Sequence, residues 1–339
     1  MTQVQHGGSP GNPHRSGGAR GGDRVMVPEA DFESYYGRPI VKPAPWEHDI
    51  AVYLFTGGVA AGSSLLAAGA DLTGRPALRR VARFGSLVSL LVSVGALVRD
   101  LGKPSRFLNM LRVVKPTSPM SVGTWILSLH GPFAGIAAAA EVAGMLPDGV
   151  KRGPVRLLLA LGRPAGIVGA LTAAPVASYT GVLLSDTATP AWHSAYKELP
   201  FVFCGSAAAA SGGLGLLGAP VAEAGPARAF AVGGAFVELA TEHRMEQSMG
   251  LAAETLHQGR AGQFMRVSKA LTALGAVGAL AGRRSRVLSM ASGAALMAGS
   301  LCTRLGVYEA GIASAKDPKY TVVPQRERVD RGEPVRYRG

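Results

Sequence analysis

Four long stretches of this chain carry no charged side chain. They are residues 50–70, 116–140, 164–185 and 199–222, which contain no Asp, Glu, Lys or Arg. Each is long enough to cross a bilayer as a helix, which takes about 20 residues. Charged residues make up only 17% of the chain, against roughly 25% in an ordinary globular protein. The sequence therefore predicts an all-α integral membrane protein and argues against a water-soluble enzyme.

The apolar pattern predicts eight transmembrane helices. Six have clear boundaries, at residues 48–70, 82–99, 120–146, 156–185, 197–220 and 286–307. Two weaker ones, residues 225–243 and 264–282, include charged side chains. Because Pro164 and Pro175 fall within the fourth helix, we expect a kink there. An even number of crossings returns both ends of the chain to one side of the membrane.

A faint internal repeat divides the predicted helices into two halves. The run YLFTGGVAAG at residues 53–62 aligns with FVFCGSAAAA at residues 201–210, which predicts two four-helix bundles over residues 46–190 and 191–308. Small residues that recur because they allow close helix packing are the alternative explanation. The outer segments, residues 1–45 and 309–339, are polar; we expect the first to be disordered and the second to be a tail.

The net charge of +13 does not predict a nucleic-acid partner. The Lys and Arg residues lie mainly in the two outer segments and at helix ends, where cations meet lipid headgroups. The two cysteines, Cys204 and Cys302, both lie in apolar stretches. An iron–sulfur cluster needs about four thiolates, so we expect none in this chain.

The connection between the second and third predicted helices is too long for a simple turn. It interleaves the charged residues Asp100, Lys103 and Arg106 with apolar ones such as Phe107 and Leu108. This composition predicts a piece that lies at the membrane interface or re-enters the bilayer. Its basic side chains could steer an acidic partner or hold a lipid headgroup. Asp100, Lys103 and Arg106 are therefore candidate docking residues, and a solvated basic loop is the alternative.

Several motifs resemble those of the NrfD family, the polysulfide-reductase-type membrane subunits. The most specific are DLGKPSRF at residues 100–107 and SPMSVGTW at residues 118–125. Three further runs agree with them: YLFTGGVAAG at residues 53–62, YTGVLLS at residues 179–185 and AKDPKYTVVP at residues 315–324. The similarity extends over about residues 45–325. Lys103 departs from the pattern, because an arginine is more usual at that position.

The resemblance implies a haem-less, quinone-reactive membrane anchor whose eight helices form two four-helix bundles in the cell membrane. It implies menaquinone as the bound carrier, a ferredoxin-like partner subunit with four iron–sulfur clusters, and a molybdopterin catalytic subunit. It also implies that the quinone pocket lies in the first bundle, near the face that meets the iron–sulfur partner.

The histidines provide an independent argument on the cofactor. A haem held by two imidazoles needs paired histidines well inside the helices, and only His130 lies at mid-helix depth. No spacing typical of metal ligands is present either. We therefore expect electrons to pass between a bound organic carrier and another subunit.

A quinone site needs hydrogen-bonding groups, a group that exchanges protons and an apolar slot. The terminal side of the first four helices offers His48, Asp49, Trp125, Tyr179 and, deeper, His130. The resemblance identifies Tyr179 as the quinone-contacting tyrosine. His130 is the candidate for handling protons, because an unperturbed imidazole titrates near neutrality. The alternatives are a core hydrogen bond for His130 and a helix-start position, favoured by the helix dipole, for His48 and Asp49.

Two acidic residues inside predicted helices suggest a proton path. Carboxylates within a membrane are costly, and they usually line water or pair with a cation. Glu238 has Glu242 on the same helix face, and Glu141 lies toward the opposite end of the first bundle. A plain ion pair, for example between Glu141 and Arg163, is the alternative.

The leading interpretation is a subunit that exchanges electrons between menaquinol and an iron–sulfur partner. A secondary transporter or proton-conducting membrane protein is the second hypothesis, and it would require broken helices that meet in mid-membrane. A structural anchor that has lost its quinone pocket is the third.

Overall fold

The structure is a computed structural model that describes residues 39–332 except 47 and 101–102, without the side chains of His48 and Pro104. These residues belong to one unit, Gly37–Gly339. Most of the predicted disordered tail, residues 1–45, lies outside the described part. The described residues contain twelve α-helices, three short 3-10 helices and no strand, which confirms the prediction of an all-α protein.

Nine long helices make up most of the fold. They are α1 (His48–Leu72), α2 (Pro76–Asp100), α4 (Pro119–Met145), α5 (Pro154–Leu171), α6 (Ala173–Ser185), α8 (Leu199–Gly218), α9 (Gly225–Ser248), α10 (Gly259–Ala281) and α11 (Arg286–Lys316). The remaining elements lie in the connections or follow α11. They are η1 (Pro104–Arg106), α3 (Phe107–Met110), η2 (Asp148–Val150), α7 (Pro190–Ser194), η3 (Gly250–Leu256) and α12 (Lys319–Asp330).

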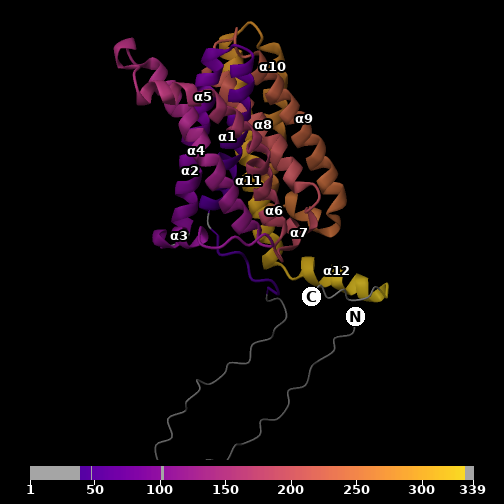
Figure 1. Ribbon diagram of the computed structural model, residues 1–339. Helices are drawn as coiled ribbons and strands as arrows, with labels where there is room; N and C mark the ends of the chain where they lie inside the picture. The colour runs from indigo at the N-terminus through magenta and orange to yellow at the C-terminus, as the bar shows by residue number, and fades with distance from the viewer. Residues whose placement is uncertain (1–38, 47, 101–102, 333–339) are drawn as a thin grey trace, which may run out of the picture. The chain divides into compact units, whose positions relative to one another are not determined.

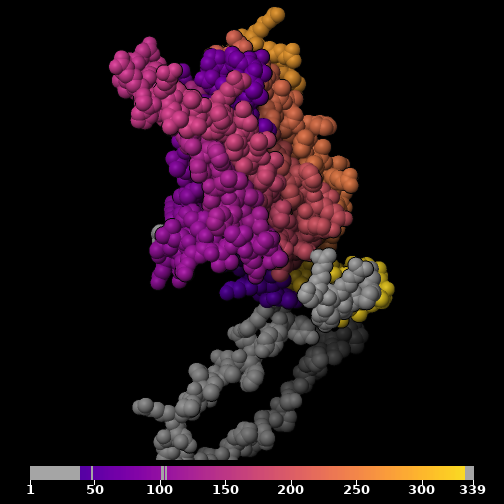
Figure 2. All heavy atoms as spheres, viewed as in Figure 1, coloured from indigo at the N-terminus to yellow at the C-terminus, as the bar shows by residue number. Residues whose placement is uncertain are grey.

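With α5 and α6 counted as two parts of one helix, the long helices alternate in direction and define two ends of the helical assembly. We call the end where α1, α4, α8 and α10 begin the terminal face; α3, α7 and α12 lie at this end (Figure 1). The other end is the opposite face, where the connection between α4 and α5 projects (Figure 2). Both the start of α1 and the end of α11 lie at the terminal face, as predicted from an even number of crossings.

Six segments in the described residues are long and apolar enough to cross a membrane. They are Asp49–Leu72, Pro76–Asp100, Pro119–Met145, Pro154–Ser185, Leu199–Gly218 and Gly259–Ala281. The protein is therefore a multi-pass membrane protein. The segment predicted as a weak helix at residues 264–282 is among the six, whereas α9 and α11 are not. Both carry charged residues along their length, such as Glu238 and Arg304.

Helices α1 and α8 form the centre of the assembly. In their apolar stretches 78% and 67% of the residues are buried, against 28–44% in the other four candidate spans. Helix α1 packs along α2, α5, α6 and α8, and α8 packs along α9 and α11. Since the other spans expose more of their surface, they face the lipid side and enclose these two.

The fourth predicted helix is broken into α5 and α6 at Thr172. Pro175 has no backbone N–H to donate to the carbonyl of Leu171 and its ring crowds that carbonyl. The hydroxyl of Thr172 lies 3.1 Å from the carbonyl oxygen of Val168 and 3.0 Å from that of Gly169, so it satisfies a backbone acceptor next to the break. Pro164, the other predicted kink position, lies inside the continuous helix α5.

Glycine allows α8 and α9 to approach closely. A Cβ atom placed on Gly205 would lie 2.5 Å from the backbone nitrogen of Glu238, and one on Gly212 would lie 2.5 Å from that of Ala231. No side chain fits at such distances, so the two backbones pack directly against each other. This contact fixes the position of Glu238 in the core.

The C-terminal part is more helical than the polar tail predicted for residues 309–339. Helix α11 continues to Lys316, and α12 follows at Lys319–Asp330. The extended part of α11 packs against α7, where the indole of Trp192 occupies the space that a side chain at Gly311 would need. Residues 333–339 lie outside the described part.

Candidate functional site

A cleft of about 1200 Å³ opens between α4 and α6 near the terminal face. Its apolar wall includes Val122, Ile126 and Val182. Its polar lining includes Tyr179, Ser185, Asp186, His193, Tyr196 and Arg328. An apolar slot with a few polar groups at one end is the usual form of a small-molecule site.

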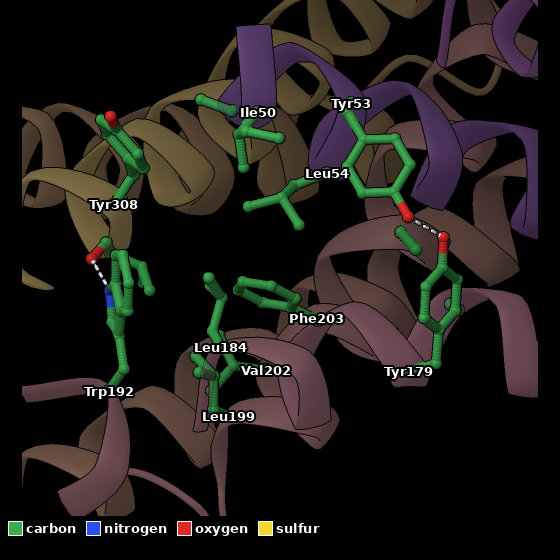
Figure 3. Packing of buried hydrophobic residues seen from close by; sticks show 14 of the residues in the cluster. Ile50, Tyr53, Leu54, Tyr179, Leu184, Trp192, Leu199, Val202, Phe203 and Tyr308 are labelled. Carbon is green, nitrogen blue, oxygen red and sulfur yellow. Dashed lines mark hydrogen bonds between the residues drawn. The ribbon is translucent and has the colours of Figure 1, made fainter. Parts of the chain in front are cut away.

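Tyr179 lies in the wall of this cleft and forms a hydrogen bond with Tyr53. The two hydroxyl groups meet in the core, between α6 and α1 (Figure 3). Only 6% of Tyr179 and 3% of Tyr53 are exposed. Each hydroxyl carries one hydrogen, so one tyrosine donates within the pair and the other keeps its hydrogen for a further acceptor. If Tyr53 donates, the hydrogen of Tyr179 is free for a ligand in the cleft.

His193 and Asp186 provide the groups that can exchange protons in the cleft. The Nδ1 atom of His193 lies 3.1 Å from the carbonyl oxygen of Ser185. A carbonyl only accepts, so Nδ1 carries the hydrogen and the neutral ring keeps a lone pair on Nε2. Trp192 fixes the short helix α7 by donating from Nε1 to the carbonyl of Val307 at 2.7 Å. The position of His193 at the cleft is therefore set by a buried neighbour.

Two of these groups were missed as site residues by the sequence analysis. Tyr53 appears in the sequence analysis only as part of a glycine-containing run, and His193 is not singled out there. Tyr53 could have been found from the sequence. Because successive membrane helices run in opposite directions, the first turns of α1 and the last turns of α6 must lie at the same end. No comparable signal pointed to His193, whose position depends on the packing of α7.

His130 does not line the cleft and is fully buried beside α1 and the break between α5 and α6. Its Nδ1 is 2.8 Å from the hydroxyl of Thr172, and its Nε2 is 3.3 Å from that of Ser64. Ser64 is in turn 2.7 Å from Ser86. His130 thus joins α4 to the break between α5 and α6 and to α1 through a chain of hydroxyl groups, and both ring nitrogens have partners.

Of the other predicted quinone residues, Trp125 and Asp49 do not line the cleft. Trp125 is 39% exposed and donates from its indole to the carbonyl of Val113 at 3.3 Å. Asp49 forms an ion pair with Arg99 at 3.2 Å. His48 begins α1, and its side chain lies outside the described residues. Of the five sequence-predicted positions, Tyr179 is the one that the structure places in the cleft wall.

The predicted docking residues gather at the terminal face. Asp100 is the last residue of α2, Arg106 ends η1, and Lys103 lies just before it. Lys103 and Arg106 are exposed. The following segment is fastened to α4, since Ser121 donates to the carbonyl of Val113 at 3.2 Å. The connection therefore lies against the start of α4, beside the cleft.

Glu141 lies near the opposite face in a buried ion-pair network. It is 2.6 Å from Nε of Arg79 and 3.2 Å from Nη1 of Arg83. The prediction suggested Arg163 as a partner of Glu141, but Arg163 instead reaches Asp71 at 3.8 Å. Helix α2 supplies the two arginines because its first turns lie at the same end as the last turns of α4.

Glu238 is fully buried between α9, α10 and α11. It accepts a hydrogen bond from Thr303 at 2.6 Å. Glu242, one turn further along α9, is also fully buried and lies 3.4 Å from the ammonium of Lys269. This second acidic group is separate from the cleft, on the other side of the central helix α8.

The fold and the cleft define a class: a multi-pass helical membrane protein with a cleft near the face where α1 begins and α11 ends. The chain matches the family model of NrfD, polysulphide reductase, over residues 40–221, and it belongs to that family. This confirms the resemblance seen in the sequence. Members are membrane subunits of polysulfide or nitrite reductase-type complexes and associate with other oxidoreductase subunits. No protein among the curated sequences matches the chain.

The matched residues include the whole cleft except Arg328, which α12 contributes. They end after α8, so α9, α10 and α11 lie beyond the match. The cleft is therefore in the part of the chain that defines the family, and the acidic group around Glu238 is not.

Proposed function

We propose that this protein is a haem-less, quinone-reactive membrane subunit that passes electrons between menaquinol and an iron–sulfur partner. The observation that carries the proposal is Tyr179 in the wall of the cleft, with its hydroxyl bonded to Tyr53 and with His193 and Asp186 in the lining of the same cleft. When bound, a quinone supplies two-electron, two-proton redox chemistry that the side chains of this chain lack.

The cleft suits a flat ring with a long apolar tail. Val122, Ile126 and Val182 offer an apolar surface, and Tyr179 offers a hydrogen-bond donor to a ring oxygen. The orientation of that donor is fixed, because the ring of Tyr179 packs against Gly123 and its hydroxyl against Tyr53. A donor held in one place does not have to be reoriented when a ligand binds, which favours binding.

Proton exchange is assigned to His193 and Asp186. The lone pair on Nε2 of His193 accepts a proton, and the carbonyl of Ser185 stabilises the resulting imidazolium through Nδ1–H. Asp186 follows α6 directly and lines the same cleft. Because the cleft opens at the terminal face, protons leave to that side.

The electron-transfer partner is assigned to the terminal face. Lys103 and Arg106 are exposed there, next to apolar side chains such as Leu108, which is 66% exposed. Positive charge attracts an acidic surface, and a ferredoxin-like subunit with four iron–sulfur clusters is the partner we propose for it. A molybdopterin subunit would complete the complex in the cytoplasmic membrane.

We further propose that α9 and α11 also cross the membrane, giving eight crossings in two bundles. Both helices pack along α8 and α10, which are apolar enough to cross. Their buried charges, Glu238, Glu242 and Arg304, face the protein interior and not lipid. The uncharged faces of α9 and α11 meet the membrane.

The test is a Tyr179→Phe variant of the complex, assayed for quinol oxidation. Removing a donor to the charge that develops on the reacting ring lowers turnover by roughly 100- to 1000-fold. Ser178→Ala is the matched control, since Ser178 lines the same cleft but donates to the carbonyl of Ala174 at 2.9 Å within its own helix. Normal turnover of an assembled Tyr179→Phe complex would contradict the proposal, as would isolation of the native complex without quinone.

A further inference from the structure

An unusual concentration of charged side chains lies inside the second half of the protein, between α9, α10 and α11. Glu238 and Glu242 are each 0% exposed, and Arg304 is 1% exposed. The guanidinium of Arg304 donates to the carbonyl of Phe203 at 2.9 Å and lies 3.6 Å from the centre of the Phe203 ring. Burial of such groups costs several kcal/mol each unless they are paired, so their presence calls for a function.

The charges of this group do not balance. Three carboxylates, Glu238, Glu242 and Glu246, face two permanent cations, Lys269 and Arg304. His257, whose Nε2 lies 3.9 Å from Glu246 at the outer end of the group, adds a positive charge only when it is protonated. Apart from the ion pair with Lys269, neither oxygen of Glu242 has a hydrogen-bond partner in the described part of the chain. Bound positive charge, equal to one proton, would bring the group to neutrality.

The hydroxyl groups beside Glu238 can form hydrogen bonds with this residue whether or not it carries a proton. Thr303 donates to Glu238 at 2.6 Å and lies 2.6 Å from Ser268 and 3.2 Å from the carbonyl of Gly299. If Glu238 gains a proton, it can donate to Thr303, which can then turn its own hydrogen to Gly299. The same side chains therefore satisfy the acid with and without a proton.

Exposure falls steadily from the terminal face to this group. The side chain of Lys269 is 38% exposed, that of Glu246 15%, and that of Glu242 1%. Lys269 lies 2.7 Å from Glu246 and 3.4 Å from Glu242, so it bridges the outer and the inner acid. A route that a proton could follow thus begins at Glu246, near the end of α9.

Close packing ends this route toward the opposite face. Beyond Glu238, a Cβ atom on Gly212 would lie 2.5 Å from the nitrogen of Ala231, and one on Gly275 would lie 2.7 Å from Cγ of Leu296. These contacts leave no room for water between α8 and α9 or between α10 and α11 at those positions. The group has the properties of a binding site with one entrance and not of a channel.

We propose that Glu238 and Glu242 together bind one exchangeable proton, taken up from the terminal face through Glu246 and Lys269. The groups that face these acids come from every neighbouring helix. They are Ser206 on α8, Glu246 on α9, His257 just after η3, Lys269 and Ser268 on α10, and Thr303 and Arg304 on α11. None of these residues lines the cleft beside Tyr179, and both acids lie outside the residues that match the family.

The experiment is infrared difference spectroscopy of the purified complex between acidic and alkaline buffer. The expected result is a carboxylic acid C=O band that is present in acid and is lost or shifted in both Glu238→Gln and Glu242→Gln. Glu141→Gln is the control, because Glu141 is also buried but has two arginine partners. An unchanged band in the Glu238 and Glu242 variants, or no band in the native complex, would overturn the proposal.

Chemical labelling of the native complex tests the proposal without any variant. If the variants do not assemble, the native complex is treated with dicyclohexylcarbodiimide, which modifies protonated carboxyl groups in apolar surroundings, and the labelled peptide is identified by mass spectrometry. Labelling at Glu238 or Glu242 should fall by about tenfold for each pH unit once the group is mainly ionised. Neither acid being labelled, or labelling that sodium ions suppress at constant pH, would refute a proton as the occupant.

Discussion

The ring of Tyr179 lies directly against the backbone of Gly123, in the space that any side chain at residue 123 would occupy. The glycine lets α4 approach α6 closely enough for the tyrosine to be held edge-on in the cleft wall. The hydroxyl at the far end of the ring is then fixed by Tyr53. Both ends of the Tyr179 side chain are therefore positioned by other helices.

Replacing Gly123 with Ala should displace the ring of Tyr179. We expect quinol oxidation to fall by roughly 10- to 100-fold, because small displacements of a positioning group have effects of this size. Gly135→Ala, in the same helix, is the control, since nothing lies within 4 Å of a Cβ at that position. Equal activities of the two variants would show that Tyr179 does not need its present position.

Replacing Tyr53 with Phe should weaken the site through Tyr179. The lost hydrogen bond contributes about 0.5–1.5 kcal/mol, so we expect a several-fold loss of turnover. The double variant with Tyr179→Phe should be no worse than Tyr179→Phe alone, because the two residues act through one contact. Additive losses in this double-mutant cycle, measured with a soluble quinol, would mean that Tyr53 contacts the ligand separately.

Replacing Glu141 with Gln should destabilise the protein without reaching the cleft. The change removes the nearer of two carboxylates beside Arg83, which is 6% exposed, and leaves Asp71 at 3.5 Å as the remaining one. Breaking a buried ion pair completely costs about 3–5 kcal/mol, so we expect a smaller loss here. Thermal unfolding of the detergent-solubilised complex should show a lower midpoint. Asp148→Asn, which removes an exposed ion pair with Lys151, should leave the midpoint nearly unchanged.

Replacing Trp125 with Phe should loosen the connection that precedes α4. The indole donates to the carbonyl of Val113, and phenylalanine keeps the ring but not the donor. Limited proteolysis should then cut residues 107–118 faster than in the native protein. Ser121→Ala removes the other side-chain donor to Val113 and should act in the same direction. A cutting rate that neither variant changes would show that the connection is held by other contacts.

The attachment of α12 should depend on salt and on high pH. Lys319 lies 2.6 Å from Glu254, and this hydrogen bond raises the pKa of Lys319 above its ordinary value. The contact is therefore complete at neutral pH and is lost only as the pH rises through the raised pKa. Because both side chains are exposed, salt screens the pair. Amide exchange in residues 319–330 should increase in high salt and in Glu254→Gln, but not in Glu327→Gln.

The sequence predicted the helices and their directions because an uncharged run long enough to cross a bilayer has few alternatives. It also predicted Tyr179 at the correct end of α6. The sequence also placed Trp125 and Asp49 at the site, because the depth of a residue along a helix can be counted from the sequence. In the structure these two residues have the expected depth but do not line the cleft. The direction in which a side chain points depends on how the helices are rotated, and that rotation is set by contacts such as Gly123 against Tyr179.

The partners of buried charges were harder to predict. Arg79 and Arg83 lie more than fifty residues from Glu141 in the sequence, and their contact depends on α2 packing beside α4. The same is true of Arg304 and Phe203, which join α11 to α8. The extension of α11 beyond residue 307 also depends on a distant residue, since Trp192 packs on Gly311.

Helix α11 is eleven residues longer than α8, 31 against 20, which is about 16 Å along the axis. Arg286, at its start, donates to the carbonyl of Leu216 near the end of α8, so the two helices are level at the opposite face and the surplus projects at the terminal face. Helix α8 alone matches the thickness of the hydrocarbon layer. If α11 crosses the membrane beside α8, as proposed, Gly311 and the Trp192 that packs on it lie past the end of a hydrocarbon layer as thick as α8, and a molecule entering beside His193 would leave the lipid tails before it reached the polar end of the cleft.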